Sequence, residues 1–260
     1  SLRAELEKAA GDVVVLHAGD FLFPSLLSQR FNGEQMVDGM NLLDGDAEAR
    51  DPHLLVTFGN HEFDRDKLKH APMLQSRINE SQFDWLGSNI VFKSDATGRK
   101  LIQGENLVAS RLLTVNGVKV GFVGVTTDVK GAEYIERFLP PIEIVGNATR
   151  RLRQQGAQLV VAITHQTVAQ DKALLAALGD NAPDFIAGGH EHDRQHHVVN
   201  GRHLVKADAD VASAAVVRIT VQQARPLTQV ATQVEYVEFP GQYQPDRALT
   251  RRLVEWNRRF

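Results

Sequence analysis

Side chains able to bind a metal ion follow four short apolar segments of this sequence. Each segment is a short apolar run, and the first three are rich in Val, Ile or Leu, which predicts buried β-strands. The segments "VVVLHAG", "LLVTFG", "VVAIT" and "DFIAGG" are followed, in that order, by these residues: Asp20, Asn60 with His61, His165, and His190 with His192. In open α/β sheets, ligands bind beyond the carboxyl ends of the strands. Without a shared role, a ligand-type side chain would have to follow each of the four segments by coincidence. The pattern therefore predicts a ligand site built from these side chains.

The chemistry of these groups points to metal ions. Carboxylate, amide and imidazole groups form an oxygen and nitrogen ligand set that suits Zn, Mn, Fe, Ni or Mg. In "GGHEH", His190 and His192 stand at i and i+2, so in an extended segment both project to one side and can reach adjacent metals. Asp20 suits a bridge, because a carboxylate offers two oxygens. Two metal ions about 3.5–4 Å apart activate a hydroxide and stabilise charge on phosphorus during in-line displacement, so we expect hydrolysis of a phosphate ester.

Two further candidates lie in "GNHEFD". His61 adjoins the predicted ligand Asn60 and can donate a hydrogen bond or a proton to the phosphate or to the leaving oxygen. Asp64, three residues on, can hold this imidazole in one tautomer and favour its charged form. We therefore predict His61 and Asp64 as a catalytic pair.

The elements that carry these residues alternate between strand and helix patterns, which indicates an α/β fold. Residues 1–240 are predicted to form one domain. Residues 241–260 contain an amphipathic helix. Its apolar stripe comprises Leu249, Leu253, Trp256 and Phe260, and the helix is a possible linker to an absent domain. The chain opens with a helix that Ser1 caps and Gly11 ends. Because a βαβ layout places a strand before such a helix, we expect the domain to be truncated at its N-terminus.

Composition narrows the class of protein. The 260 residues include 29 basic and 32 acidic side chains, a formal charge of −3, so no strong basic field predicts a nucleic-acid partner. No apolar run approaches the roughly 20 residues that span a bilayer. The absence of Cys excludes disulfides, thiolate metal sites and a Cys nucleophile.

The motifs resemble those of a known family. "GD" at 19–20, "GNHEFD" at 59–64, "TH" at 164–165 and "GGHEH" at 188–192 follow the order and spacing of the calcineurin-like metallophosphoesterases. "GEQMVDGMN" before "GNHEFD", together with "GSNI", is similar to the 5′-nucleotidase / 2′,3′-cyclic-nucleotide phosphodiesterase branch. The likeness covers about residues 11–220. It implies an α/β fold of the α/β/β/α sandwich type, with two packed mixed β-sheets flanked by helices.

The resemblance also implies a role for each matched residue. Asp20 would bridge two divalent metal ions; Asn60, His165 and His190 would complete one site, and His192 would belong to the other. The family's first motif, Asp-x-His on a strand before the first helix, has no counterpart here. The second site is therefore expected to be incomplete in this chain, either through truncation or because the strand is truly absent.

The expected substrate is a small phosphate ester, a nucleotide in particular, and the family resemblance suggests a periplasmic or secreted location. The resemblance implies a following C-terminal domain, which supplies aromatic side chains that stack on a nucleobase and would lie beyond residue 260. No substrate-binding residue, native metal or oligomeric state can be assigned from the sequence. Two alternatives stay open: a non-catalytic or metal-deficient relative with a binding or structural role, and another two-metal hydrolase, such as a nuclease or a lipid phosphodiesterase.

Overall fold

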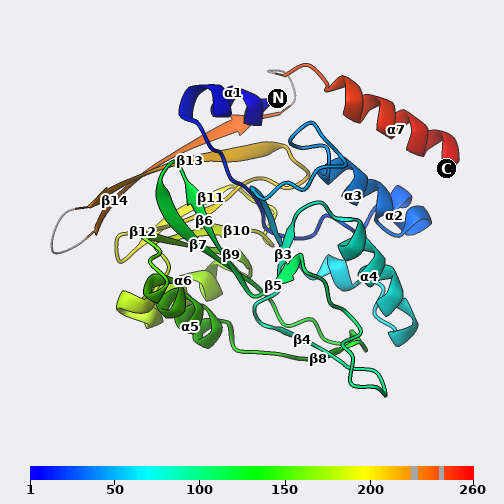
Figure 1. The fold of residues 1–260 in the computed structure, drawn as a ribbon, viewed down its shortest axis with the longest axis horizontal. Helices are drawn as coiled ribbons and strands as arrows, with labels where there is room; N and C mark the ends of the chain where they lie inside the picture. The colour runs from blue at the N-terminus through cyan, green and yellow to red at the C-terminus, as the bar shows by residue number, and fades with distance from the viewer. Residues whose placement is uncertain (224–227, 240–242) are drawn as a thin grey trace.

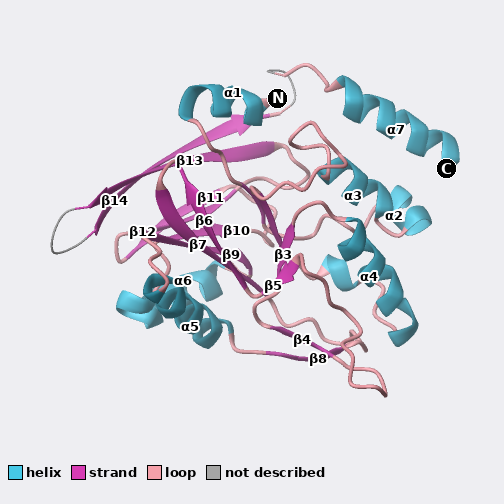
Figure 2. Ribbon diagram, viewed as in Figure 1, coloured by secondary structure: helices cyan, strands magenta, loops and turns pink. Residues whose placement is uncertain are grey.

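Two β-sheets pack face to face at the centre of the molecule, and helices cover their outer faces (Figures 1 and 2). The computed structural model describes residues 1–223, 228–239 and 243–260. The helices are α1 (Leu2–Ala10), α2 (Leu26–Phe31), α3 (Glu34–Met40), α4 (Ala71–Glu80), α5 (Pro141–Gln154), α6 (Val168–Leu178) and α7 (Arg247–Arg259). Three single 3₁₀ turns are η1 (His61–Phe63), η2 (Leu68–His70) and η3 (Gly179–Asn181).

The first sheet has four strands in the order β1-β2-β3-β5, all parallel. Its strands are β1 (Val15–His17), β2 (Leu54–Thr57), β3 (Asp84–Leu86) and β5 (Leu107–Val108). Every residue of β2 is buried, as expected for a strand with protein on both faces. This explains why "LLVT" is apolar without alternation.

The second sheet has six strands in the order β11-β12-β10-β9-β7-β6 and is mixed. Its strands are β6 (Ser110–Val115), β7 (Val118–Thr126), β9 (Leu159–His165), β10 (Phe185–Gly188), β11 (Gln195–Val199) and β12 (Arg202–Lys206). The four central strands run parallel, while β6 and β11 are antiparallel edges. Two smaller antiparallel pairs are β4 (Ile90–Phe92) with β8 (Ile135–Phe138), and β13 (Ser213–Gln223) with β14 (Thr228–Glu238).

The layers are held together by apolar side chains on both sides of each sheet. Leu55 and Leu86 of the first sheet pack against Phe122, Val161 and Ile163 of the second. A second apolar cluster joins the first sheet to α3 and α4, and a third joins the second sheet to α5 and α6. The predicted α/β/β/α sandwich is therefore confirmed. The expectation that both sheets are mixed holds for the six-stranded sheet only, because the four-stranded sheet is purely parallel.

The two ends of the chain form the predicted helices. The hydroxyl of Ser1 accepts a hydrogen bond from the N–H of Ala4, and α1 ends at Gly11. The indole of Trp256 in α7 is buried and donates to Asp38 Oδ2 of α3 at 2.8 Å. Leu253 and Phe260 of the predicted stripe are 44% and 63% exposed, so only part of the stripe packs against the rest of the domain. Among the described residues, no helix has the length and apolar character required to cross a bilayer.

Candidate metal centre

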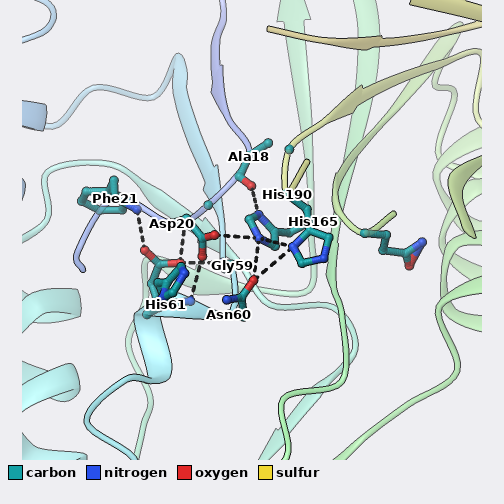
Figure 3. Close-up of polar contacts among 12 residues, drawn as sticks. Ala18, Asp20, Phe21, Gly59, Asn60, His61, His165 and His190 are labelled. Atoms are coloured by element: carbon teal, nitrogen blue, oxygen red, sulfur yellow. Dashed lines mark hydrogen bonds and ion pairs between the residues drawn. The ribbon is translucent and has the colours of Figure 1, made fainter. Parts of the chain in front are cut away.

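The predicted ligands come from strand ends of both sheets. Asp20 follows β1 and Asn60 follows β2, two paired strands of the first sheet. His165 ends β9 and His190 follows β10, two paired strands of the second sheet. Because each pair is parallel, its carboxyl ends lie together, and the packing of the two sheets brings all four side chains to one place (Figure 3).

Four donor atoms converge there. His165 Nε2 lies 3.0 Å from Asp20 Oδ2, 3.1 Å from Asn60 Oδ1 and 3.3 Å from His190 Nδ1. His190 Nδ1 lies 3.1 Å from the same Asn60 oxygen. The ligand atoms of Asp20, His165 and His190 all lie within 4.8 Å of one another. The structure thus brings together four of the five predicted metal ligands.

The backbone fixes the tautomer of His165. Its Nδ1 lies 2.6 Å from the carbonyl oxygen of Ala18, and a carbonyl can only accept, so Nδ1 carries the proton. This leaves the lone pair of Nε2 directed at the candidate ligand atoms of Asp20, Asn60 and His190. Metal-ligating histidines characteristically donate their second ring N–H in this way. Two imidazole nitrogens, an amide oxygen and a carboxylate that face one another fit a divalent cation of the Mn or Zn type.

The pKa shifts in the cluster also indicate a site that favours a cation. Burial alone would lower the pKa of His165, but the hydrogen bond and charge of Asp20 outweigh it and raise this pKa. Burial alone would raise the pKa of Asp20, which the contact with His165 instead lowers. Burial, and then His165, lowers the pKa of His190. The site therefore favours one positive charge between its donors, and a proton or a metal ion can supply it.

Two glycines let the turns after β1 and β2 approach each other. A Cβ at Gly19 would lie 2.3 Å from the backbone nitrogen of Gly59, and a Cβ at Gly59 would lie 2.1 Å from Asp20 Oδ1. Asp20 itself has a φ of 63°, in the left-handed region. Its Oδ1 accepts from the N–H of His61 at 2.7 Å, so the second turn holds the carboxylate that the first turn presents.

A residue without a role in the sequence-based prediction, Glu62, organises both turns. This carboxylate is completely buried. Its Oε2 accepts from the N–H groups of Asp20 (2.8 Å) and Gly59 (2.5 Å), and its Oε1 accepts from those of Phe21 (2.8 Å) and Leu22 (3.1 Å). Burial, reinforced by the charge of Asp20, outweighs these donors and raises the pKa of Glu62. In the sequence, only its place at the end of "GNHE" could have drawn attention to it.

The predicted contact between His61 and Asp64 is present at the edge of the site. His61 Nδ1 lies 3.0 and 3.2 Å from the two carboxylate oxygens of Asp64. Both side chains are about one-third exposed. The arrangement suits a group that donates to a ligand, and the catalytic role of the pair stays a prediction.

His192 lies apart from the four converging donors. The argument for its placement assumed an extended backbone, but His190 and His192 have φ angles of 85° and 62°, so the alternation of side chains along a strand does not apply. The His192 residue is exposed, and it is outside the cluster found among the described residues. Its assignment to a second metal site stays a prediction, as does bridging by Asp20.

Comparisons with known proteins agree with this architecture. The family model for calcineurin-like phosphoesterases matches residues 1–194. A 5′-nucleotidase of Vibrio cholerae is 28% identical over 222 residues, covering 79% of this chain and 36% of that protein. Endonuclease YhcR of Bacillus subtilis is 25% identical over 256 residues, 90% of this chain and 20% of that protein. The chain thus spans about a third or less of the length of these curated relatives.

Among solved structures, the calcineurin-like phosphoesterase YfkN of Bacillus subtilis superimposes with a TM-score of 0.77 over 99% of this chain and 86% of that chain, at 15% sequence identity. A likeness at this identity shows the fold. The family model covers three-quarters of the residues, including every strand end that carries a metal-ligand candidate. The resemblance read from the motifs, to the superfamily and its 5′-nucleotidase branch, is confirmed, and this chain belongs to the calcineurin-like phosphoesterase family.

Proposed function

We propose that this chain is the catalytic domain of a metal-dependent phosphoesterase that hydrolyses phosphate esters of nucleotides or similar small molecules. The observation that carries the proposal is the convergence of Asp20, Asn60, His165 and His190 around one point, with the N–H of His165 turned away onto Ala18. These four side chains would hold one divalent cation. Two such ions in the intact protein would supply a lowered pKa of bound water and neutralisation of charge on the phosphate.

The remaining side chains have supporting tasks. Asp64 orients His61 so that its free ring nitrogen can donate to a phosphate oxygen or to the leaving group. Glu62 fixes the backbone that presents Asp20 and Gly59. Together, these three side chains place a hydrogen-bond donor, the free ring nitrogen of His61, beside the cation site. None of the three is itself a metal ligand.

The family membership and the 5′-nucleotidase relative support a nucleotide as the substrate class. The endonuclease relative makes a nucleic-acid substrate the competing outcome. A non-catalytic metal-binding role is favoured by one observation, namely that His192 lies outside the donor cluster of the described residues.

A single substrate comparison tests these possibilities. The chain is loaded with Mn²⁺ or Zn²⁺, desalted and assayed for metal content and for hydrolysis of AMP, a 2′,3′-cyclic nucleotide, bis(p-nitrophenyl) phosphate and single-stranded DNA. Turnover of a nucleotide that is lost in His165→Ala and kept in the surface control His196→Ala supports the proposal. Turnover of DNA alone would replace it with a nuclease, and metal binding without any turnover would support the non-catalytic alternative.

A further inference from the structure

A completely buried lysine lies directly behind the metal-ligand candidates. Lys206 ends β12, and its residue is only 1% exposed. Its Nζ donates to the carbonyl oxygens of Gln166 (2.6 Å) and Gly189 (2.8 Å) and to Glu191 Oε2 (2.5 Å). Asp171 Oδ2, on α6, lies 3.2 Å from the same nitrogen. A buried charge is tolerated when it is paired and hydrogen-bonded. The three N–H donors of an ammonium group match the two carbonyl oxygens and Glu191 Oε2, while Asp171 adds a neighbouring negative charge.

The two carbonyls that Lys206 binds flank the ligand candidates. Gln166 directly follows His165, and Gly189 directly precedes His190. One ammonium group therefore connects the end of β9 to the end of β10 at the level where both strands present a metal donor. The order of strands explains how, because β12 pairs with β10 and β10 pairs with β9.

The segment that Lys206 holds is strained and tightly packed. His190 has a φ of 85°, which costs free energy for a residue with a Cβ and persists only where the surroundings impose it. A Cβ at Gly188 would lie 2.8 Å from Lys206 Cε, and a Cβ at Gly189 would lie 2.7 Å from the carbonyl oxygen of Ala18. Both glycines are needed for this close approach.

A second contact secures the far side of the segment. Glu191 Oε1 accepts from the N–H of Val168, in the first turn of α6, at 2.6 Å, while its Oε2 binds Lys206. Asp171, from the same helix, is completely buried beside the ammonium group. The segment 188–191 is thus tied to β12 and to α6 through Lys206, although Lys206 touches neither His165 nor His190 in the contacts described.

We propose that Lys206 is a positioning residue for the metal centre: by binding Gln166, Gly189 and Glu191, it holds the 188–192 segment in the conformation that aims His190 at the donors of the other strands. This inference rests on the proposed function for its purpose, since a metal site is what the positioning serves. The direct consequence of the Lys206 contacts is local order in the 188–192 segment, and this order does not require a bound metal ion.

The test removes Lys206 together with Asp171, so that the completely buried carboxylate of Asp171 is not left without its cation. The carboxylate of Glu191 is 26% exposed and keeps the N–H of Val168 as a donor. Lys206→Met with Asp171→Asn keeps the approximate size of both side chains. Replacing a buried ion pair by uncharged groups of similar volume is often neutral for stability. The matched control, Arg153→Met with Asp184→Asn, alters an ion pair of 2.9 Å near the opposite end of β9.

Two measurements are made on each protein: amide hydrogen exchange of residues 186–193 in metal-free protein, and the dissociation constant for Mn²⁺. We expect faster exchange in this segment and a 10- to 100-fold weaker Kd for the Lys206 double variant, the usual effect of losing an outer partner of a metal ligand. The control should match the wild-type chain in both. Exchange and Kd within twofold of wild type in a folded Lys206 double variant would overturn the proposal.

A second variant covers the case in which the double variant does not fold. Glu191→Ala removes the acceptor on the segment side, where the side chain is 26% exposed, and should also accelerate exchange in residues 186–193. Unchanged exchange in this variant would overturn the proposal. A wild-type chain that binds no Mn²⁺ would refute the proposed function, while the exchange comparison in metal-free protein would still decide whether Lys206 holds the segment.

Discussion

Replacing Glu62 by Gln should destabilise the protein by about 3 kcal/mol, although the two side chains have nearly the same shape. Each carboxylate oxygen of Glu62 accepts two backbone N–H groups in a site without solvent access. An amide can place its oxygen on one side only, so two N–H groups would face an NH₂ group. Hydrogen bonds to a charged group contribute about 1.5–3 kcal/mol each, which sets the gross loss at about 3–6 kcal/mol.

The lower end of this range is expected because the carboxylate is itself costly to bury. Burial raises the pKa of Glu62 despite its four donors, so a neutral side chain recovers part of the desolvation cost of the ion. A loss of about 3 kcal/mol is within the 5–15 kcal/mol by which domains are usually stable, and the variant should therefore fold.

Urea unfolding of the metal-free protein, followed by circular dichroism and by the fluorescence of the buried Trp85, measures the loss. Glu133→Gln is the matched control, since Glu133 Oε2 also accepts a backbone N–H, that of Leu68 at 3.0 Å, but its side chain is 48% exposed. We expect less than about 1 kcal/mol from the control. If Glu62→Gln also costs less than about 1 kcal/mol, the four N–H groups do not depend on this carboxylate and the reasoning is refuted.

Three further predictions concern the histidines. His61→Ala should lower kcat about 10²- to 10⁴-fold with unchanged metal content, and near-normal turnover would remove His61 from the mechanism. Burial, and then the charge of His165, lowers the pKa of His17 from 6.5 to about 4, so the unfolded chain takes up the proton first as the pH falls. The free energy of unfolding should therefore drop by up to about 3 kcal/mol between pH 6.5 and 4. An equal drop in the His17→Asn variant over the same pH range would contradict this prediction. Because Asp20 raises the pKa of His165, a metal ion must displace a proton below that pKa. Mn²⁺ affinity should consequently weaken as the pH falls, with proton uptake by the buffer in calorimetry, and a pH-independent affinity would argue that Nε2 is not a ligand.

The parts of the site that follow from the sequence are those set by strand ends. Asn60 and His165 come directly after apolar segments that are completely buried, and Asp20 follows a partly buried one; parallel pairing brings such ends together. The contact between His61 and Asp64 follows from a spacing of three residues in a single turn. These are local features, and local patterns predict them.

The parts that escape prediction depend on contacts between distant segments. Glu62 binds N–H groups about 40 residues away, and Lys206 binds the carbonyl of a residue 40 positions earlier. Neither relation has a periodicity in the sequence. The position of His192 was inferred from an extended backbone, and the left-handed φ angles of the loop invalidate that assumption. A "GG" before the histidines indicates a sharp turn, but not the direction in which the next side chains point.

These tertiary contacts have a common consequence for how the centre works. The ligand candidates come from two sheets, and two of the four are fixed by hydrogen bonds that do not need a metal: Asp20 by the N–H of His61, and His165 by the carbonyl of Ala18. The second of these bonds crosses from one sheet to the other. The free energy needed to bring four electron-rich atoms together is therefore supplied by packing of the sheets and by the turns that Glu62 organises. In the proposed phosphoesterase, a cation would meet ligands that are already aimed, so its binding energy would be available to hold and polarise a phosphate ester rather than to assemble the site.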